Sequence, residues 1–379
     1  MSEHPEFPLG DDLIYLNHAG VSPWPRCTAR AIAVFAEENV TRGAARYPEW
    51  LKREAALRDR LVRLIGAAAP SDVAFIKNTS EGLSFIAGGL AWKSGDQVLI
   101  NRAEFPSNRI VWESLRDQGV ETVDVNLAAG ASPEDSLIDA MTPRTRLLTV
   151  SSVQYGSGLR MDLAKLADAC RAHGVLFCVD AIQTLGALRF DLSAVDADFV
   201  VADGHKWMLG PEGLGVFWVR PELRDQLRPT QFGWRMVANA GDYDRKDWEI
   251  APDARRYEPG SPNMLGIHGL AASLSLLQDS EGMASVERKV LRNSEYLIEK
   301  IKQKTVLELV TDPAEERRSG IVTFRPRRGD GKALHRALVD AGVICASRSG
   351  GVRFSPHFYT PEDKLDAAVQ MAAEFAGRP

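Results

Sequence analysis

The sequence predicts an α/β protein in which helices cover a mostly parallel sheet, followed by a smaller α+β domain. Between residues 70 and 220, strand-like and helix-like segments alternate along the chain. The strand-like segments are continuous apolar runs, which is typical of parallel strands buried on both faces. After about residue 260 the pattern changes to two long helical segments and then to shorter strands. A length of 379 residues leaves room for two domains of this kind.

The first half of the chain changes type from one segment to the next. The strand candidates are, in order, "DVAFIK", "DQVLIN", "ETVDVNL", "TRLLTVSSV", "VLFCVDA", "ADFVVA" and "GVFWVR". Helices are expected at "TSEGLSFIAGGLAW", at "NRIVWESLRDQG" and over residues 162–173, where Asp162 can cap the N-terminus and Gly174 ends the helix. Helices that connect successive strands favour parallel pairing, so we expect a mostly parallel sheet.

The second half begins with a polar connector. The stretch "YDRKDWEIAPDARRYEPGSPN" is rich in charge, Pro and Gly and is expected to be a loop. Two helices follow over about 264–279 and 283–303, then strands at "GIVTFRPR", "GVICAS" and "GVRFSPHF". Thr360 and Pro361 would cap and start a last helix. Short strands mixed with helices in this way indicate the smaller α+β domain.

Composition and charge narrow the classes of function. The net charge of −5 argues against a protein dedicated to nucleic acid or to acidic membranes. The N-terminal segment lacks the pattern of a signal peptide, and no run approaches the roughly 20 apolar residues of a membrane span, so a cytoplasmic location is expected. The four cysteines form no CxxC pair and the seven histidines form no HExxH, so neither a disulfide framework nor a metal site is indicated.

Polar residues follow several predicted strands, which is where an open parallel sheet binds its ligands. Asp180 ends "VLFCVDA" and Gln183 lies three residues later. Thr79 and Ser80 lie where a strand passes into a helix, so free backbone N–H groups and two hydroxyls could face a phosphate. Phe105 follows a third strand. Each has an ordinary explanation when it is taken alone: a turn, a helix cap or a core residue.

Lys206 is the residue that an ordinary explanation fits least well. It follows the apolar run "FVVA" in "DGHKWMLGPEGLG", beside His205 and three large apolar residues. Burial there would lower the pKa of the amine and favour its neutral form, which forms Schiff bases with carbonyl groups. A phosphate anchor, an aromatic side chain, an aspartate and this lysine together match the requirements of pyridoxal 5′-phosphate (PLP). The set is far more specific than any of its members.

With these motifs the chain resembles the class V aminotransferase family of fold-type-I PLP enzymes. That family includes cysteine desulfurases, cystine lyases, isopenicillin N epimerases and kynureninases. The resemblance extends from "YLNHAG" at 15–20 to "VRFSPHFYT" at 352–360 and is strongest at "DGHKWMLGPEGLG". It implies a seven-stranded, mostly parallel sheet in a large domain over residues 20–260. It also implies a small domain made of residues 1–19 and 261–379.

The resemblance assigns roles to the residues around the cofactor. Lys206 matches the Schiff-base lysine, Asp180 the partner of the pyridine nitrogen, and Gln183 the group that bonds the ring hydroxyl. The remaining cofactor contacts would be the phosphate ligands Thr79, Ser80 and His205, and Phe105 stacked on the ring.

The resemblance also implies a homodimer with shared active sites and a substrate-carboxylate site. Ser261, in "YEPGSPN", matches a hydroxyl that reaches the cofactor phosphate of the partner subunit. Arg353 matches the arginine that binds the substrate carboxylate, and a planar guanidinium suits that task. Weaker candidates for substrate contact are Asn17, His18, Tyr155, Trp234, Arg235 and His357.

Two departures from the family pattern bear on function. Asp203 stands where many relatives have a small hydroxyl residue, and because an acid would repel a phosphate we expect its side chain to point elsewhere. Desulfurases carry a nucleophilic cysteine on a loop before the carboxylate arginine, whereas only "CASRSGGVR" is available here. We therefore expect Cys345 to be a buried structural residue.

The sequence leaves the reaction open. We expect first an aminotransferase that acts on the α-amino group of a small amino acid, with Lys206 as the general base. A Cβ–S lyase of the cysteine or cystine lyase or desulfurase type is the alternative, and an amino-acid epimerase is another. A PLP-binding scaffold without turnover is a further possibility, but the intact Lys206, Asp180, Gln183 and Arg353 set argues against it. A nucleotide-binding domain is disfavoured because neither a GxGxxG nor a P-loop motif follows an early strand.

Overall fold

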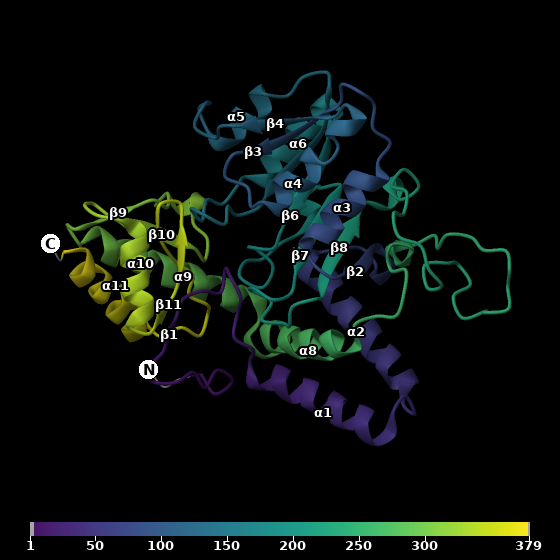
Figure 1. The fold of residues 1–379 in the computed structure, drawn as a ribbon, viewed down its shortest axis with the longest axis horizontal. Coiled ribbons are helices and arrows are strands. Elements are labelled where there is room, and N and C mark those ends of the chain that lie inside the picture. The colour runs from purple at the N-terminus through teal and green to yellow at the C-terminus, as the bar shows by residue number, and fades with distance from the viewer. Residues whose placement is uncertain (1–3, 378–379) are drawn as a thin grey trace.

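The apolar runs of the first half form the central sheet of a large domain (Figure 1). In the computed structural model, which describes residues 4–377, this sheet has seven strands in the order β2-β8-β7-β6-β5-β3-β4. In that order they are Val73–Ile76, Gly215–Val219, Phe199–Asp203, Leu176–Asp180, Thr145–Ser151, Gln97–Asn101 and Glu121–Val125. The predicted mostly parallel seven-stranded sheet is confirmed.

Only β8 runs against its neighbours, pairing antiparallel with both β7 and β2. A parallel partner for β7 would need a crossover of a dozen or more residues, usually with a helix. The connection from Asp203 to Gly215 has no helix and returns directly along β7. Lys206 lies on this short connection. The lysine is therefore held beyond the carboxyl end of β7, at the edge where parallel strands present their ligand-binding residues.

The sheet is buried on both faces, which explains why its strands are continuous apolar runs. Successive side chains of a strand point to opposite faces. Val200 and Ala202 accordingly belong to one core cluster, and Phe199 and Val201 to another. Helices α3 and α4 supply residues to the second cluster, whereas α2, α6 and α8 supply residues to the first.

The large domain contains four helices that the sequence analysis did not predict. These are α1 (Arg26–Arg42), α2 (Tyr47–Ile65), α5 (Pro133–Asp139) and α7 (Leu192–Val195). The other helices of this domain are α3 (Thr79–Gly89), α4 (Ser107–Glu113), α6 (Leu163–His173) and α8 (Met264–Ser275). Asp162 caps α6 and Gly174 ends it, as predicted. Helix α8 begins beyond residue 260, the expected domain boundary, yet it packs against α1 and α2 of the large domain.

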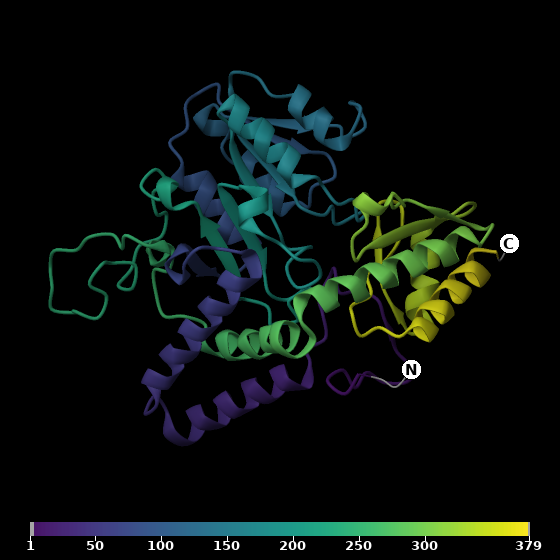
Figure 2. The same cartoon turned by 180° about the vertical axis from the view of Figure 1, so that it is seen from behind.

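The small domain is built from both ends of the described chain (Figures 1 and 2). A π-helical turn, Leu276–Glu281, continues α8 toward α9 (Met283–Lys302), which lies in the small domain. The other small-domain elements are β1 (Ile14–Tyr15), β9 (Leu307–Leu309), β10 (Val322–Pro326), α10 (Gly331–Asp340), β11 (Val343–Ile344), β12 (Ala346–Arg348), β13 (Gly351–Phe354) and α11 (Glu362–Ala376).

Two details of the small domain bear on the sequence analysis. Ile14 of β1 pairs with Val343 of β11 in parallel, so the N-terminal segment is tied to the C-terminal half. Helix α11 begins after Pro361, but Thr360 does not cap it, because the Thr360 hydroxyl accepts the backbone N–H of His357 instead. Among residues 4–377 no helix is both long enough and apolar enough to cross a membrane.

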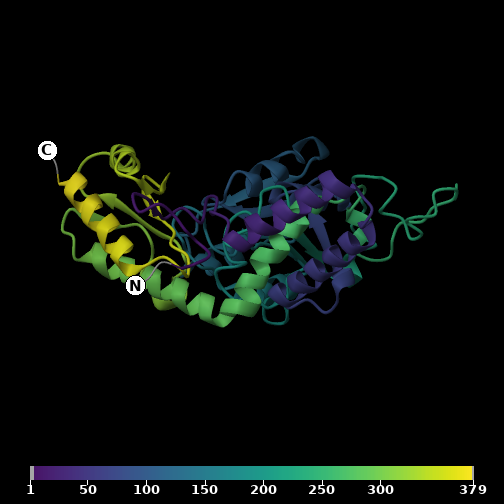
Figure 3. The same ribbon diagram turned by 90° about the horizontal axis from the view of Figure 1, so that it is seen from below.

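A long irregular loop projects from the large domain, and we call residues 231–252 the arm (Figures 1 and 3). Much of this polar connector is a loop, as predicted. Four of its aromatic side chains are exposed, with exposed fractions of 53% for Phe232, 43% for Trp234, 74% for Tyr243 and 57% for Trp248. Aromatic side chains gathered on a projecting segment indicate a contact surface rather than a solvated loop.

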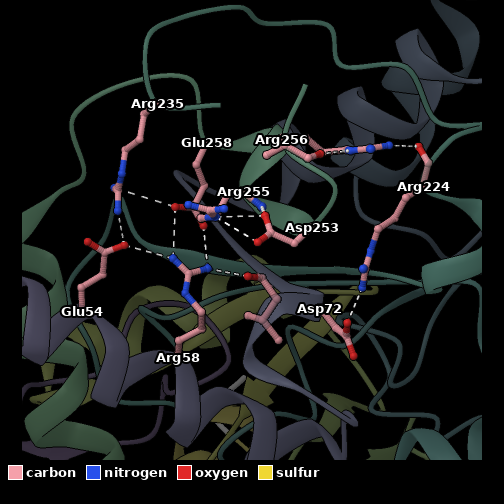
Figure 4. A network of polar contacts seen from close by, with 11 residues as sticks. Glu54, Arg58, Asp72, Arg224, Arg235, Asp253, Arg255, Arg256 and Glu258 are labelled. Atoms are coloured by element: carbon pink, nitrogen blue, oxygen red, sulfur yellow. Dashed lines mark hydrogen bonds and ion pairs between the residues drawn. The ribbon is translucent and has the colours of Figure 1, made fainter. Parts of the chain in front are cut away.

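The base of the arm is fixed by buried ion pairs, which we call the arm-root network (Figure 4). Arg58 of α2 donates to Glu258 at 2.7 and 3.1 Å and to Glu54 at 3.0 Å. Arg235, near the start of the arm, bonds to Glu54 and lies 3.8 Å from Glu258, which follows the arm. Glu258 also accepts the backbone N–H of Phe75 in β2 at 2.9 Å. The network thus joins both ends of the arm to a helix and to the sheet.

Candidate active site

A cavity of about 310 Å³ opens beyond the carboxyl ends of the parallel strands. Its lining includes eight residues that the sequence analysis selected: Thr79, Ser80, Phe105, Asp180, Gln183, His205, Lys206 and Arg353. Seven of them belong to the large domain, and Arg353 belongs to β13 of the small domain. Segments far apart in the sequence therefore meet in one site beyond the carboxyl ends of the strands, where an open parallel sheet binds its ligands.

Lys206 is held without a partner. Its Nζ makes no hydrogen bond or ion pair with any residue of 4–377, and it lies 5.7 Å from the centre of the Phe105 ring. Burial lowers the pKa of the amine to about 8, helped by the nearby Arg353 and opposed by Asp180. A lysine with its pKa near neutrality can act both as a nucleophile and as a base.

The loop that carries Lys206 is fixed by its neighbours. The indole of Trp207 donates to the Gln183 side chain at 2.8 Å. Leu209 adopts a φ of 61°, an unusual conformation for a branched residue, and its N–H bonds back to the Lys206 carbonyl at 3.0 Å. Gly186 lies directly beneath the loop, where a Cβ atom would come within 2.2 Å of the Trp207 carbonyl oxygen. These contacts hold the lysine in one position.

Asp180 ends β6 inside the cavity wall and has no cationic partner within ion-pair distance among the described residues. Burial raises the pKa of its carboxyl to about 7; the N–H of Ile182, 3.0 Å away, opposes the rise, and the charge of Glu104 adds to it. A buried carboxylate in this condition would be stabilised by a protonated ring nitrogen. The geometry therefore fits the role that the resemblance assigns to Asp180.

The N-terminus of α3 forms an anion-binding end of the cavity. Asn78 caps the helix by accepting the N–H of Glu81 at 3.0 Å. The Ser80 hydroxyl donates to Ser107 at 2.9 Å, and the buried Thr79 hydroxyl has no hydrogen-bond partner. An unpaired buried hydroxyl beside free helix N–H groups fits a phosphate. Together with Lys206 and Asp180, these residues fit the phosphate, the aldehyde and the ring nitrogen of PLP.

Arg353 is the most deeply buried cation of the site, with an exposed fraction of 1%. It donates to the Tyr155 carbonyl at 2.9 Å and to the Asn17 side chain at 3.2 Å, while its Nε has no partner. Burial lowers the pKa of Arg353 to about 9, and the charge of Arg348 adds to this effect. A buried guanidinium without a carboxylate partner is prepared to bind one.

The weaker substrate candidates divide into two groups. Tyr155 lines the cavity, and Asn17 acts indirectly by holding Arg353. The expectation that His18 contacts substrate needs correction, because it is fully buried behind the wall between Ser355 and Tyr359, at 2.8 and 2.6 Å. Three further candidates also lie off the cavity lining: His357 bonds the Trp207 carbonyl, Arg235 belongs to the arm-root network and Trp234 lies on the arm.

Ser261 does not line the cavity of its own chain and is exposed. Its assigned contact is with a partner subunit, so this contact stays a prediction.

The two departures from the family pattern have different outcomes. Cys345 is buried, as predicted, with an exposed fraction of 6%, and burial raises the pKa of its thiol to about 12. The expectation that Asp203 points elsewhere is wrong: Asp203 lines the cavity, and its Oδ1 lies 3.1 Å from Nδ1 of His205. The Asp203 carboxylate therefore reaches the cavity wall with the His205 ring beside it.

Sequence reasoning missed one charged residue that lines the cavity and one buried acid whose charge acts on Asp180. Arg348 lines the cavity together with Arg353. It lies in the short interval "CASRSGGVR", where the family pattern draws attention to a cysteine and not to an arginine. Glu104 is buried next to Phe105 and accepts hydrogen bonds from Asn101, Asn108, Ser151 and Gln154. The charge of Glu104 adds to the rise in the pKa of Asp180. A glutamate in the turn after a strand has no sequence pattern that would predict this interaction.

The chain is similar in sequence to known proteins over most of its length. The family model "Aminotransferase class-V" matches residues 14–367. A probable cysteine desulfurase of Methanothermobacter thermautotrophicus is 27% identical, with 98% of this chain and 97% of that protein covered. The isopenicillin N epimerase of Streptomyces clavuligerus is also 27% identical, with 94% of each chain covered. An uncharacterized aminotransferase of Bacillus subtilis, YcbU, is 27% identical over 91% of this chain and 90% of that protein.

Solved structures show the same fold. A structure of C-DES with glycine covalently linked to its PLP cofactor has a TM-score of 0.91 at 22% identity, with 99% of this chain and all 100% of that chain covered. A complex of the cystine C–S lyase C-DES with its reaction product cysteine persulfide has a TM-score of 0.89, also at 22% identity, over 96% and 98% of the two chains.

Proposed function

From the premise that this chain belongs to the class V aminotransferase family and binds PLP, we propose that it is a Cβ–S lyase that acts on an amino acid disulfide such as L-cystine. The named relatives include cysteine desulfurases, and a cystine lyase shares its fold. These comparisons favour the lyase alternative over the aminotransferase activity that the sequence suggested first. The relatives also include an epimerase and an aminotransferase, so the choice rests on the site itself.

The observation that carries the proposal is that two guanidinium groups without acidic partners line a cavity that has no thiol. Arg348 and Arg353 both line the cavity, and neither forms an ion pair with any residue of 4–377. The Nε atoms of both are buried without a hydrogen-bond partner. L-Cystine carries two carboxylates, one at each end. We assign the α-carboxylate of the cleaved half to Arg353 and the distant carboxylate to Arg348.

Because no thiol lines the cavity, the sulfur of the substrate must leave on a small molecule and not on a protein cysteine. None of the four cysteines lines the cavity, and Cys345 is buried with its thiol pKa raised to about 12. A protein thiolate is therefore not available to accept sulfur from substrate. In a disulfide substrate the distal half can itself carry the sulfur away, so no protein nucleophile is needed.

The chain's own residues divide the work of β-elimination. When bound, PLP supplies an electron sink for the carbanion formed at Cα. Asp180 holds the ring nitrogen protonated, and Arg353 fixes the α-carboxylate. Lys206, whose pKa is lowered to about 8, removes the Cα proton as general base.

The bond changes balance without an added oxidant or reductant. The Cα–H and Cβ–S bonds break, the proton passes to Lys206, and the sulfur leaves with the bonding electron pair as a persulfide. Addition of one water then gives pyruvate and ammonia. The overall reaction is cystine plus water to pyruvate, ammonia and cysteine persulfide.

The test compares two substrates that share the chemistry but differ in the number of carboxylates. Purified holoenzyme should form pyruvate, ammonia and free persulfide from L-cystine, and pyruvate and ammonia from β-chloroalanine, which has one carboxylate. Arg348→Gln should raise KM for L-cystine by about 10–100-fold, the cost of one charge-assisted contact, and leave KM for β-chloroalanine within about twofold.

Other product patterns would replace the proposal. Keto acid that forms only when an acceptor keto acid is supplied would identify an aminotransferase. Inverted amino acid without pyruvate would identify an epimerase. Equal effects of Arg348→Gln on both substrates would remove the assignment of the second carboxylate.

The assembly proposed with this function is a homodimer with shared active sites. The exposed aromatic residues of the arm and the exposed Ser261 support a contact with a second copy. A Lys206→Ala variant and a Ser261→Ala/Pro262→Ala variant, each impaired alone, should regain activity when their subunits are exchanged, because one site of the mixed dimer has both segments intact. A monomeric active enzyme, or no recovery despite proven exchange, would contradict it.

A further inference from the structure

Asp203 and His205 form an isolated pair at the wall of the cavity. Asp203 is the last residue of β7, and His205 follows on the connection that carries Lys206. Their side chains are nearly buried, with exposed fractions of 6% and 16%. Asp203 Oδ1 and His205 Nδ1 lie 3.1 Å apart, within ion-pair distance, and neither atom has a hydrogen-bond partner in the described chain. Each group is thus available only to the other and to whatever enters the cavity.

The residues around the pair indicate which ring nitrogen of His205 would contact a ligand. Both residues line the same cavity as Thr79 and Ser80, the hydroxyl residues at the N-terminus of α3. Because Nδ1 faces Asp203, Nε2 is the ring nitrogen left for a ligand. A carboxylate that faced a phosphate directly would repel it, whereas a carboxylate behind an imidazole can fix the orientation of the ring. Apart from His205, no cationic residue of 4–377 lies within ion-pair distance of Asp203.

We propose that Asp203 is a positioning residue for the cofactor phosphate and acts through His205. Its carboxylate accepts the Nδ1–H of the ring, fixes the ring orientation and leaves Nε2–H as a donor to the phosphate. The acid that seemed unsuited to an anion site is therefore the part that makes His205 an effective ligand. This inference concerns cofactor binding and is independent of which reaction the enzyme performs.

The test measures cofactor affinity rather than turnover. Apoprotein is titrated with PLP and, separately, with pyridoxal, which has the same ring and aldehyde but no phosphate. Asp203→Asn should weaken PLP binding by about 10–100-fold, the usual effect of removing the partner that orients a ligand-binding histidine. Pyridoxal binding should change by less than about twofold. In a His205→Gln background, Asp203→Asn should weaken PLP binding no further.

Three outcomes would overturn the proposal. Tighter or unchanged PLP binding by Asp203→Asn would mean that the acid repels the phosphate or does not act on it. Equal loss for PLP and pyridoxal would mean a structural role only. An undiminished effect in the His205→Gln background would mean that Asp203 does not act through His205.

A second measurement avoids any variant of Asp203 that fails to fold. Histidine ¹⁵N NMR of the wild-type apoprotein, with the His205 signals identified from their loss in His205→Gln, reports which ring nitrogen carries a proton. The proposal requires a protonated Nδ1 at neutral pH. An unprotonated Nδ1 would overturn it.

Discussion

The arm-root network and the active-site cavity both contain buried charges, but only in the network do the arginines have acidic partners. At the root, Arg58 contacts Glu54 and Glu258 at 3.0 and 2.7 Å. In the cavity, Arg353 and Lys206 have no acidic partner within ion-pair distance among residues 4–377. Buried charges in proteins are normally paired, because an unpaired one is costly. The contrast therefore separates a structural cluster from one that awaits its ligands.

The pKa values of two buried arginines express the same difference. Burial alone would lower the pKa of Arg58, but the attraction of Glu258 and Glu54 outweighs it and raises the pKa. Burial lowers the pKa of Arg353 to about 9, and no carboxylate offsets it. The side chains are the same and the degree of burial is similar, so partners decide the result. Perturbed and unpaired groups in a cavity mark a functional site more reliably than burial does.

The largest effect is expected from the unpaired cluster and appears in catalysis. Lys206→Ala should reduce turnover of the best substrate by about 10⁴-fold or more, because it removes both the amine that binds the cofactor aldehyde and the general base. Steady-state pyruvate release measures it, with circular dichroism as the control for folding. Retention of a tenth of wild-type turnover would contradict the assignment.

The next effect is expected from the paired cluster and appears in stability. Arg58→Met should lower the free energy of unfolding by about 3–5 kcal/mol, because the buried Glu258 and Glu54 would lose the cation that bonds both of them and would share Arg235 alone. Urea unfolding of the apoprotein measures this change. Arg353→Met is the matched control, since it removes a buried cation that has no acidic partner, and it should destabilise the apoprotein far less. Equal losses in the two variants would remove the distinction between the clusters.

A smaller effect of opposite sign is expected at Lys206 in the apoprotein. Its pKa is lowered from 10.5 to about 8 in the folded state, so between those values the unfolded chain binds more protons. Wild-type stability should therefore gain from this group as pH rises from 8 to 10.5, and the penalty is full below pH 8. Lys206→Met removes the penalty and should stabilise the apoprotein at pH 7 by at most about 3 kcal/mol. Urea unfolding at pH 7 and pH 10.5 should show the advantage disappearing at the higher pH; a constant difference would argue against it.

The smallest effect is expected at Cys345, which belongs to neither cluster. Cys345→Ser should leave turnover within about twofold and cost only the burial of one hydroxyl, about 1–3 kcal/mol of stability. Mass spectrometry of wild-type enzyme during turnover should find no persulfide on Cys345. Persulfide at this residue, together with loss of turnover in the variant, would indicate a desulfurase instead.

The elements of the sheet and the convergence of the selected residues on one cavity could be predicted because their signals are local. Apolar runs indicate buried strands, and the polar residues that follow them must converge at one edge. Helices α1 and α2 gave no such signal, since α1 buries little and packs as an outer layer on α8. The candidate substrate contacts in the first and last parts of the sequence were harder to predict. His18 lies in a turn and Arg348 ends the three-residue strand β12, and at both places neighbours that are distant in sequence decide whether a side chain faces the cavity or the core.

The arm-root network and Asp203 illustrate a second limit. Arg58, Arg235 and Glu258 are spread over α2 and both ends of the arm, so no spacing rule connects them. The prediction for Asp203 considered only its charge, which would repel a phosphate. Its pairing with His205 depends on the turn after β7. Interactions between side chains override expectations from single residues at such positions.

The parallel pairing of β1 with β11 also constrains the order in which the molecule can form during synthesis. Ile14 is synthesised long before its partner Val343. At about 5–20 residues per second, the segment around Ile14 waits for some tens of seconds while the sheet of the large domain can already assemble. Arg348 and Arg353 are synthesised shortly after Val343. A ribosome-bound chain that ends before β11 could thus hold a folded nucleus of the large domain, but it would still lack the two arginines of the cavity.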